Sequence, residues 1–159
     1  MLKFMGALLL FVATVLVGAE RYNKMCCHRQ MLGSVISSLR IMEGVLRSTH
    51  APLEECFFKT GGFFSQTATC IREGISPARA VEKTVMQCEN LSKQDKDALK
   101  RFAVGLSAPD FEGQLLNIKA LTDELSLRFA EAEQSIKSNG QLMLRGSFLV
   151  GAAIFILVL

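Results

Sequence analysis

Residues 32–46 read LGSVISSLRIMEGVL, and their apolar side chains recur at spacings of three and four residues. A helix with 3.6 residues per turn places such positions on one face, so the stretch predicts an amphipathic helix packed against a core. We expect this helix to continue from the N-terminal hydrophobic run and to end near Ser48. The recurring positions are Leu32, Val35, Ile36, Leu39, Met42 and Leu46.

Prolines mark the expected starts of further helices. Proline is tolerated in the first helical turn, where its missing N–H would have no partner in any case. We therefore predict helix starts at Pro52, which brings Leu53 into the first turn, at Pro77, and near Pro109. Each proline follows residues that can cap a helix, namely Thr49 and His50, Ser76, and Ser107.

Two adjacent glycines, Gly61 and Gly62, are expected to end the helix that starts at Pro52. The surrounding segment FFKTGGFF, residues 57–64, could form a β-hairpin about the glycines. We favour a helix–turn–helix, because an isolated two-stranded hairpin is only marginally stable in water. The following helix is then expected from about Phe63 to Gly74.

Two more helices are expected in the second half of the chain. Ser92-Lys-Gln-Asp95 resembles a capping box at a helix start, and Asp110 favours the start of the next helix. No alternation typical of strands is sustained, so the sequence predicts an all-α fold, an antiparallel bundle of about six helices. The last helix has a heptad seam with a polar gap at Asn139 and runs into the C-terminal hydrophobic run. The seam comprises Leu115, Ile118, Thr122, Leu125, Phe129, Ala132, Ile136 and Met143.

Both ends of the chain are uncharged over long runs. No charged residue occurs in residues 4–19 or in residues 146–159. A helix needs about 20 apolar residues to cross a bilayer. The first run reaches that length if Lys3 extends to the headgroups, and the second comes near it when extended back to Leu142.

These runs predict three parts: a transmembrane helix at 1–19, a helical domain at 20–145, and a second transmembrane helix at 146–159. Basic residues flank the domain side of both runs, whereas Lys3 alone lies beyond them. The positive-inside rule then places the domain in the cytoplasm and both termini outside. The flanking residues are Arg21, Lys24, His28, Arg29, Lys137 and Arg145.

Charge and motif content argue against several classes of function. Between Glu20 and Arg145 the chain has 17 basic and 15 acidic residues, and this balance of +2 (17 − 15) leaves no footprint for nucleic acid. No phosphate-binding loop, nucleophile elbow or zinc-protease motif occurs. We predict a protein that is not an enzyme and that has no cofactor and no small-molecule substrate.

The cysteines predict free thiols rather than a metal site or a disulfide framework. Their number is five, and no CxxC spacing occurs, which favours reduced, partly buried thiols. Cys26, Cys27 and His28 are consecutive, and neighbours on a helix point about 100° apart. They cannot converge on one tetrahedral ion, so we predict no metal site.

Several short motifs occur in a characteristic order. They are MLKFMG at residues 1–6 with Gly18 closing the run, THAPLEE at 49–55, and LSKQD at 91–95 followed by Leu99, Phe102, Gly105, Leu106, Ser107, Asp110 and Gln114. Together they resemble the stage III sporulation protein AB family of endospore-forming bacteria over nearly the whole chain. One departure is Leu106-Ser107, where the family usually has Leu-Gly. Ser107 then serves as a cap before Pro109.

The resemblance implies a function. The family is similar to the cytoplasmic domain of type II secretion F-type inner-membrane platform proteins. It implies a non-enzymatic scaffold in the channel between mother cell and forespore, in the mother-cell (outer forespore) membrane. The implied partners are membrane lipid, a cytoplasmic sporulation ATPase and other membrane proteins of the same channel.

The resemblance also supplies candidate contact residues. By position, Pro52 and Leu53 fall at the start of the family's second helix. Asp95, Gly105, Asp110 and Gln114 fall on its fifth-to-sixth helix junction. Because loops and element junctions commonly carry contacts, our hypothesis is that partners dock at this junction or at the turn around Gly61 and Gly62.

An alternative interpretation gives a protein of another class. The first run can be taken as a cleaved signal peptide, with Glu20 beginning the mature chain. A helical ectodomain and a hydrophobic tail would then make a secreted, tail- or lipid-anchored surface protein. Ser138, Asn139 and Gly140 would supply the polar spacer. Helical seams that run directly into both hydrophobic ends argue against this alternative.

Overall fold

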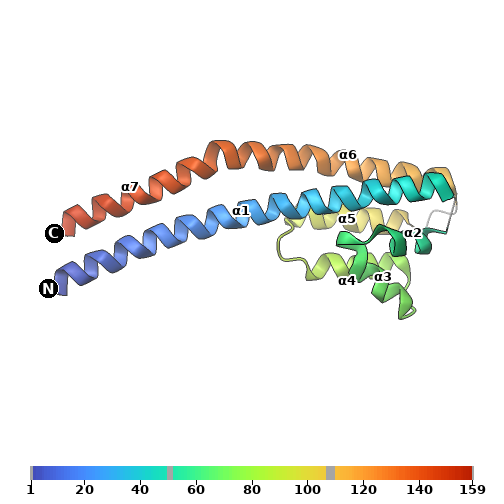
Figure 1. Ribbon diagram of the computed structural model, residues 1–159, viewed down its shortest axis with the longest axis horizontal. Helices are drawn as coiled ribbons and strands as arrows, with labels where there is room; N and C mark the ends of the chain where they lie inside the picture. The colour runs from blue at the N-terminus through green and yellow to red at the C-terminus, as the bar shows by residue number, and fades with distance from the viewer. Residues whose placement is uncertain (1, 50–51, 107–109, 159) are drawn as a thin grey trace. The chain divides into compact units, whose positions relative to one another are not determined.

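The computed structural model describes residues 2–49, 52–106 and 110–158, and every element in these ranges is helical. A 3₁₀ turn (Gly62–Phe64) precedes α3, and a π-helical segment (Ile136–Gly140) joins α6 to α7. The predicted all-α fold class is confirmed (Figure 1). The α-helices are α1 (Leu2–Thr49), α2 (Leu53–Thr60), α3 (Ser65–Arg72), α4 (Pro77–Gln87), α5 (Lys93–Gly105), α6 (Phe111–Ser135) and α7 (Gln141–Val158).

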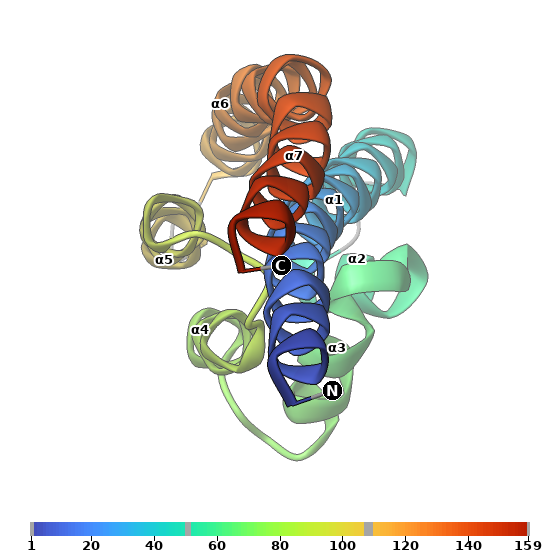
Figure 2. The same cartoon turned by 90° about the vertical axis from the view of Figure 1, so that its left-hand side faces the viewer.

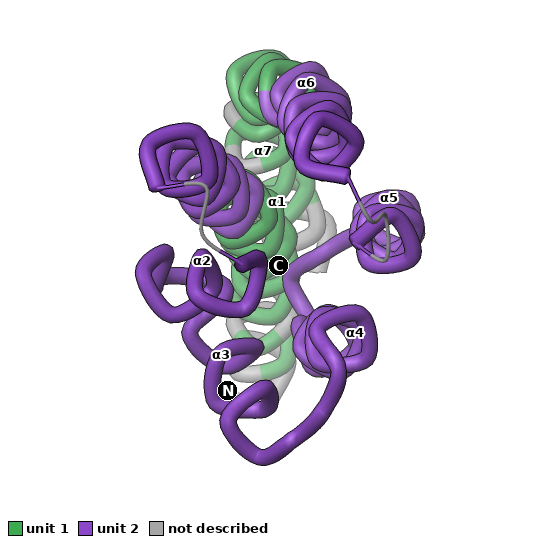
Figure 3. Tube along the Cα trace, turned by 90° about the vertical axis from the view of Figure 1, so that its right-hand side faces the viewer, with its two compact units in different colours: residues 1–29, 130–159 green, residues 30–129 purple. Residues whose placement is uncertain are grey.

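The chain divides into two compact units. Residues 30–129 form one unit, here named the bundle. Residues 1–29 and 130–159 form the other, here named the terminal pair. Figure 3 shows the bundle in purple and the terminal pair in green.

In the bundle, five helices surround a core that one face of α1 closes. Viewed from either end, α6, α5, α4, α3 and α2 follow one another around this core (Figures 2 and 3). The apolar face predicted for α1 is confirmed, because all six of its positions are at most 7% exposed. Leu99 and Phe102 of α5 and Ile118 and Leu125 of α6 are buried as well.

The helix–turn–helix predicted at the glycine pair is confirmed. Gly61 and Gly62 both have positive φ, +60° and +56°, a backbone conformation that favours glycine. The Phe63 N–H donates to the buried Ser38 hydroxyl of α1 at 3.2 Å, which fixes the turn against that helix. A Cβ on Gly62 would lie only 2.7 Å from the same hydroxyl.

Predicted helix starts agree with the structure to within two residues wherever it describes them. Pro77 is the first residue of α4, with Ser76 at the N-cap. Ser92 and Asp95 form the predicted capping box of α5. Pro52 is the N-cap residue of α2 rather than its first helical residue. The predicted caps at His50 and Ser107, and the start at Pro109, lie outside the described residues.

The heptad seam is interrupted where its sequence has a polar residue. Ile118, Thr122 and Leu125 are buried as predicted. Beyond Ser135 the expected continuous helix gives way to one π-helical turn, in which Asn139 is exposed and Gly140 is buried. A π turn adds one residue to the helical repeat, so the inward position moves from the polar side chain to the glycine.

The terminal pair packs through small residues. A Cβ on Gly18 would collide with the side chain of Ser147, and one on Gly151 would lie 2.8 Å from the Thr14 hydroxyl. Phe11 of α1 packs edge-on against Phe148 of α7 with ring centroids 5.7 Å apart. Five other large apolar side chains face outward and are 63–75% exposed: Leu9, Leu16, Leu142, Leu149 and Ile156. Within the part of the chain that the structure describes, no helix has both the length and the hydropathy to cross a membrane.

The glycine turn generates a test of stability. We expect Gly62→Ala to lower the free energy of unfolding of the full-length chain by about 2 kcal/mol, from left-handed strain and from the clash with Ser38. Urea titration followed by circular dichroism measures this change.

Two other glycines serve as controls for the backbone strain and for the clash with Ser38. Gly74 has φ +87° with nothing within 4 Å of an added Cβ, so Gly74→Ala should cost about 1 kcal/mol from strain alone. Gly44 lies exposed inside α1, and Gly44→Ala should raise stability by about 0.5–1 kcal/mol. Equal losses at Gly62 and Gly74 would show that the Ser38 contact contributes nothing.

Candidate partner-contact site

The start of α2 presents one candidate residue to solvent and one to the core. Pro52 is exposed, and its carbonyl accepts a hydrogen bond from the Glu55 N–H at 2.9 Å. Leu53 is only 8% exposed. Pro52 is therefore open to a partner, whereas Leu53 anchors α2 in the bundle.

Aromatic side chains pack beside the glycine turn. Phe64, directly after the turn, is buried and packs edge-on against Phe57 with ring centroids 5.4 Å apart. Phe58 faces outward, and the Arg72 guanidinium lies 5.0 Å from its ring centroid. The turn itself is at the surface, since Gly61 is half-buried and Gly62 exposed.

Asp95 is a structural residue of α5. It is 1% exposed, and its carboxylate accepts hydrogen bonds from the Ser92 N–H at 3.0 Å and the Ser92 hydroxyl at 2.5 Å. The other carboxylate oxygen pairs with Arg128 of α6 at 3.0 Å. The side chain thus joins two helices and offers no surface to a partner.

Arg128 belongs to a chain of charges that the sequence analysis did not identify. Its second terminal nitrogen pairs with Glu124 at 2.6 Å, and Glu124 also pairs with Arg101 of α5 at 2.9 Å. Glu124 and Arg128 are four residues apart on one helix, a spacing that favours ion pairs and was visible in the sequence. Nothing local indicated Asp95 as their partner, 33 residues away along the chain.

At the α5–α6 junction, one amide fixes the end of α5. The Asn117 side chain of α6 donates to the Phe102 carbonyl at 3.0 Å. A Cβ on Gly105 would lie 2.5 Å from the same amide nitrogen, so the glycine permits this close approach. Gly105 is half-buried, and its main role is to let α5 and α6 pack closely.

Asp110 starts α6 as predicted. Its carboxylate accepts a hydrogen bond from the Gly113 N–H at 2.8 Å, and its carbonyl accepts one from the Gln114 N–H at 3.2 Å. Asp110 is exposed and Gln114 is half-buried. A negative charge at this helix N-terminus also interacts favourably with the helix dipole.

The structure brings most of the candidates to one end of the bundle. Figure 1 places the start of α2 and the α5–α6 junction toward the same end of the bundle, whereas Figure 3 shows α2 and α5 on opposite sides of its core. Gly61 and Gly62 lie at the other end of α2, about 12 Å along an eight-residue helix. Asp95 lies at the opposite end of α5 from the junction.

Two exposed apolar side chains flank this junction. Val104, near the end of α5, is 76% exposed, and Leu116, in the second turn of α6, is 70% exposed. Sequence reasoning passed over both because they lie off the apolar stripes of their helices. Contiguous apolar patches at a surface often mark contacts with other proteins, whereas single exposed apolar side chains are common.

None of the five cysteines, all of which lie within the described residues, forms a disulfide. Cys56 and Cys70 are buried, and burial raises the pKa of the Cys56 and Cys88 thiols. Both groups therefore stay neutral near pH 7 and act as small apolar residues. No cluster of three metal-ligating side chains occurs among the described residues.

The buried ion pair generates a second test. Arg128→Met leaves the Asp95 carboxylate without its cation, and we expect the unfolding free energy to fall by about 2–3 kcal/mol. The loss stays below the largest values known for buried pairs because both Ser92 donors remain. Urea unfolding of the full-length chain measures it.

Arg101→Met is the matched control. Arg101 is 65% exposed in its pair with Glu124, so its removal should change stability by less than about 1 kcal/mol. Similar losses in both variants would mean that the buried Asp95 pair does not hold α5 to α6.

Two comparisons with known proteins point to one family. The family model described as stage III sporulation protein AB matches residues 3–159. A curated relative, stage III sporulation protein AB of Bacillus subtilis (strain 168), is 24% identical over 171 residues, with all of both chains covered. No solved structure matches. The match covers nearly the whole chain, and the chain therefore belongs to the stage III sporulation protein AB family.

Proposed function

We propose that this sporulation protein is a non-enzymatic platform in a cell membrane, with its bundle in the cytoplasm. In the proposal, both hydrophobic ends lie in the membrane of the mother cell that surrounds the forespore. Support comes from the family, from the uncharged runs at residues 4–19 and 146–159, and from basic residues on the domain side of both. Outward-facing Leu16 and Leu149 in the terminal pair are consistent with a lipid environment.

We further propose that the bundle docks a cytoplasmic sporulation ATPase, and that this places the motor beside other membrane proteins of the channel. The observation that carries this step is the exposure of Val104 and Leu116 on both sides of the α5–α6 junction. The hydrogen bond from Asn117 to the Phe102 carbonyl ties α6 to the end of α5, which lowers the ordering cost of a contact that uses both helices. Asp110 adds a negative charge at the edge of this proposed docking surface.

Binding to the ATPase tests the docking surface. We expect Val104→Asp or Leu116→Asp to weaken binding of the purified ATPase at least about tenfold, since each puts a charge into an apolar contact. Binding is measured by calorimetry with the full-length chain in detergent. Met86→Asp on α4 is the control, because Met86 is 59% exposed but lies on another helix.

A wider scan decides the location if those variants bind normally. Alanine substitutions at Pro52, Asp110 and Gln114, and at the turn between α2 and α3, should leave the circular dichroism spectrum unchanged. Unaltered ATPase binding in all of these variants would refute docking at either turn.

Membrane topology is tested with a single reactive cysteine. Ala120 is exposed on α6, so Ala120→Cys is placed in a chain whose native cysteines are replaced, and cells are treated with an impermeant maleimide. We expect protection in intact cells and labelling after permeabilisation. A cysteine added after Leu159 is the control and should be labelled in intact cells. Labelling of Ala120→Cys from outside would favour the secreted, tail-anchored alternative.

A further inference from the structure

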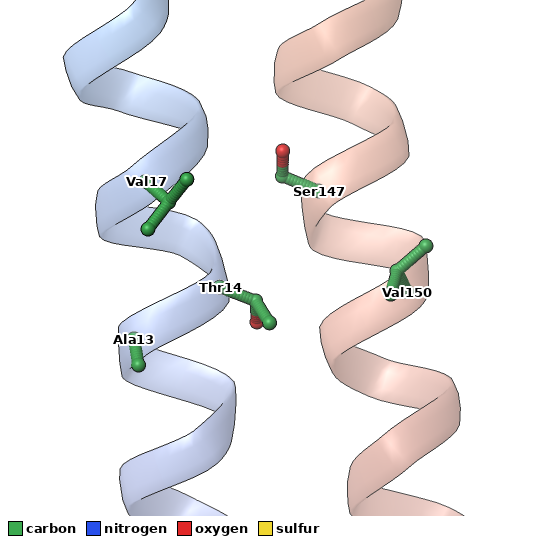
Figure 4. A pocket seen from close by; sticks show the side chains of 5 residues that line it. All are labelled: Ala13, Thr14, Val17, Ser147 and Val150. Carbon is green, nitrogen blue, oxygen red and sulfur yellow. The ribbon is translucent and has the colours of Figure 1, made fainter.

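An apolar pocket of about 380 Å³ lies between α1 and α7 of the terminal pair. Figure 4 shows it: Thr14 of α1 points toward α7, and Ser147 of α7 points toward α1. Val17 and Ala13 continue the wall on α1, and Val150 continues it on α7. The size falls within the range of small-molecule sites.

Both hydroxyls in the pocket already donate within their own helices. The Thr14 hydroxyl donates to the Phe11 carbonyl at 2.8 Å, and the Ser147 hydroxyl donates to the Met143 carbonyl at 2.7 Å. Neither proton is left to attract a polar ligand. The remaining lining side chains are hydrocarbon, so the pocket suits an aliphatic chain.

A cationic residue follows the pocket lining along α1. Arg21 lies one helical turn beyond Val17 on the same face of α1, and side chains on a helix lean toward its N-terminus. The guanidinium can therefore reach back toward the pocket. Arg21 is exposed, and the neighbouring charges Glu20 and Lys24 pair with each other at 2.7 Å. Arg21 forms no ion pair within the described residues.

We propose that this pocket and Arg21 form a binding site for an anionic phospholipid. One acyl chain occupies the pocket, and the guanidinium binds the phosphate, to which it can donate two parallel hydrogen bonds. The inference rests on the proposed membrane location, because only a bilayer supplies this ligand in the required orientation. Arg21 is next to the end of the uncharged run, at the level where headgroups lie.

A phospholipid satisfies both features of the site, whereas a second copy of the chain satisfies one. A helix of another copy could fill an apolar groove, but it would leave the Arg21 charge without an anion. An anionic lipid provides both a hydrocarbon chain for the pocket and a negative charge for Arg21. The chain and the charge lie in the same order along the lipid as the pocket residues and Arg21 lie along α1.

Lipid retention tests the site. The full-length protein is purified in mild detergent, and bound phosphatidylglycerol and phosphatidylcholine are measured by native mass spectrometry. We expect the wild-type chain to keep one phosphatidylglycerol in preference to phosphatidylcholine. Arg21→Gln should weaken that binding about fivefold, as expected for one arginine near a lipid surface. Ala13→Trp fills the pocket and should reduce retention of both lipids.

Arg145→Gln is the matched control. Arg145 is also exposed and flanks the other uncharged run. It is not in the pocket lining and lies about 200° around α7 from Ser147, so retention should not change. If both arginine variants lost the same amount of phosphatidylglycerol, general attraction between positive charge and anionic lipid would explain the retention, and the proposed site would be overturned. Unchanged retention in Arg21→Gln would overturn it as well.

Two further readouts separate the remaining outcomes. Efficient disulfide cross-linking between copies of Val150→Cys would assign the groove to a second copy and overturn the lipid site. Flotation with phosphatidylglycerol vesicles tests the membrane location by itself. If the wild-type chain floats without selective retention, only the lipid site fails. If it does not float, the proposed membrane location fails too.

Discussion

The Asp95 carboxylate receives donors from two directions inside the bundle, and the geometry of α5 and α6 follows from that arrangement. Ser92 supplies a backbone and a hydroxyl donor from the start of α5, and Arg128 supplies a cation from α6. A buried carboxylate is costly without such partners, so the register of the two helices is strongly constrained. Seven residues further along α5 from Asp95, that register brings the Phe102 carbonyl to the Asn117 side chain at the junction. The positions of the proposed docking residues, Val104 and Leu116, therefore depend on the Asp95–Arg128 contact near the start of α5.

The opposite side of the bundle depends on a smaller contact of the same kind. Ser38 lies on α1 within the buried face and accepts a hydrogen bond from Phe63, directly after the glycine turn. Because Gly62 has no side chain, the turn can approach α1 closely enough for that bond. Phe64 then enters the core against Phe57, and α3 starts in a fixed direction. In both places, a polar atom on a long helix sets the position of a short one, while apolar burial supplies the general attraction.

Local features of the sequence were sufficient for the elements but not for their contacts. Periodicity identified the buried face of α1, and proline and capping chemistry located the starts of α4 and α5, because these signals act within one or two turns. The Asp95–Arg128 pair joins residues 33 apart, and nothing within a turn of either residue specifies the other. The π turn at Ile136–Gly140 contains Asn139, the polar residue of the heptad seam. A polar residue on a seam does not by itself predict a π turn, because it can also occur in a regular helix. Exposure of Val104 and Leu116 could not be predicted, since it depends on which faces neighbouring helices cover.

The two units use opposite packing chemistry, and this contrast bears on the membrane proposal. In the bundle, large side chains such as Phe102 and Leu125 are buried, as expected where water drives apolar groups together. In the terminal pair, Gly18 and Gly151 lie at the helix contact, while Leu149 and Ile156 face outward. Water would penalise that arrangement, because it exposes the groups whose burial is most favourable. Lipid removes the penalty, since its tails are as apolar as leucine, and helix association then depends on close backbone approach through small residues. The proposed membrane insertion would thus give a physical reason for an arrangement that is unfavourable for a helical pair in water.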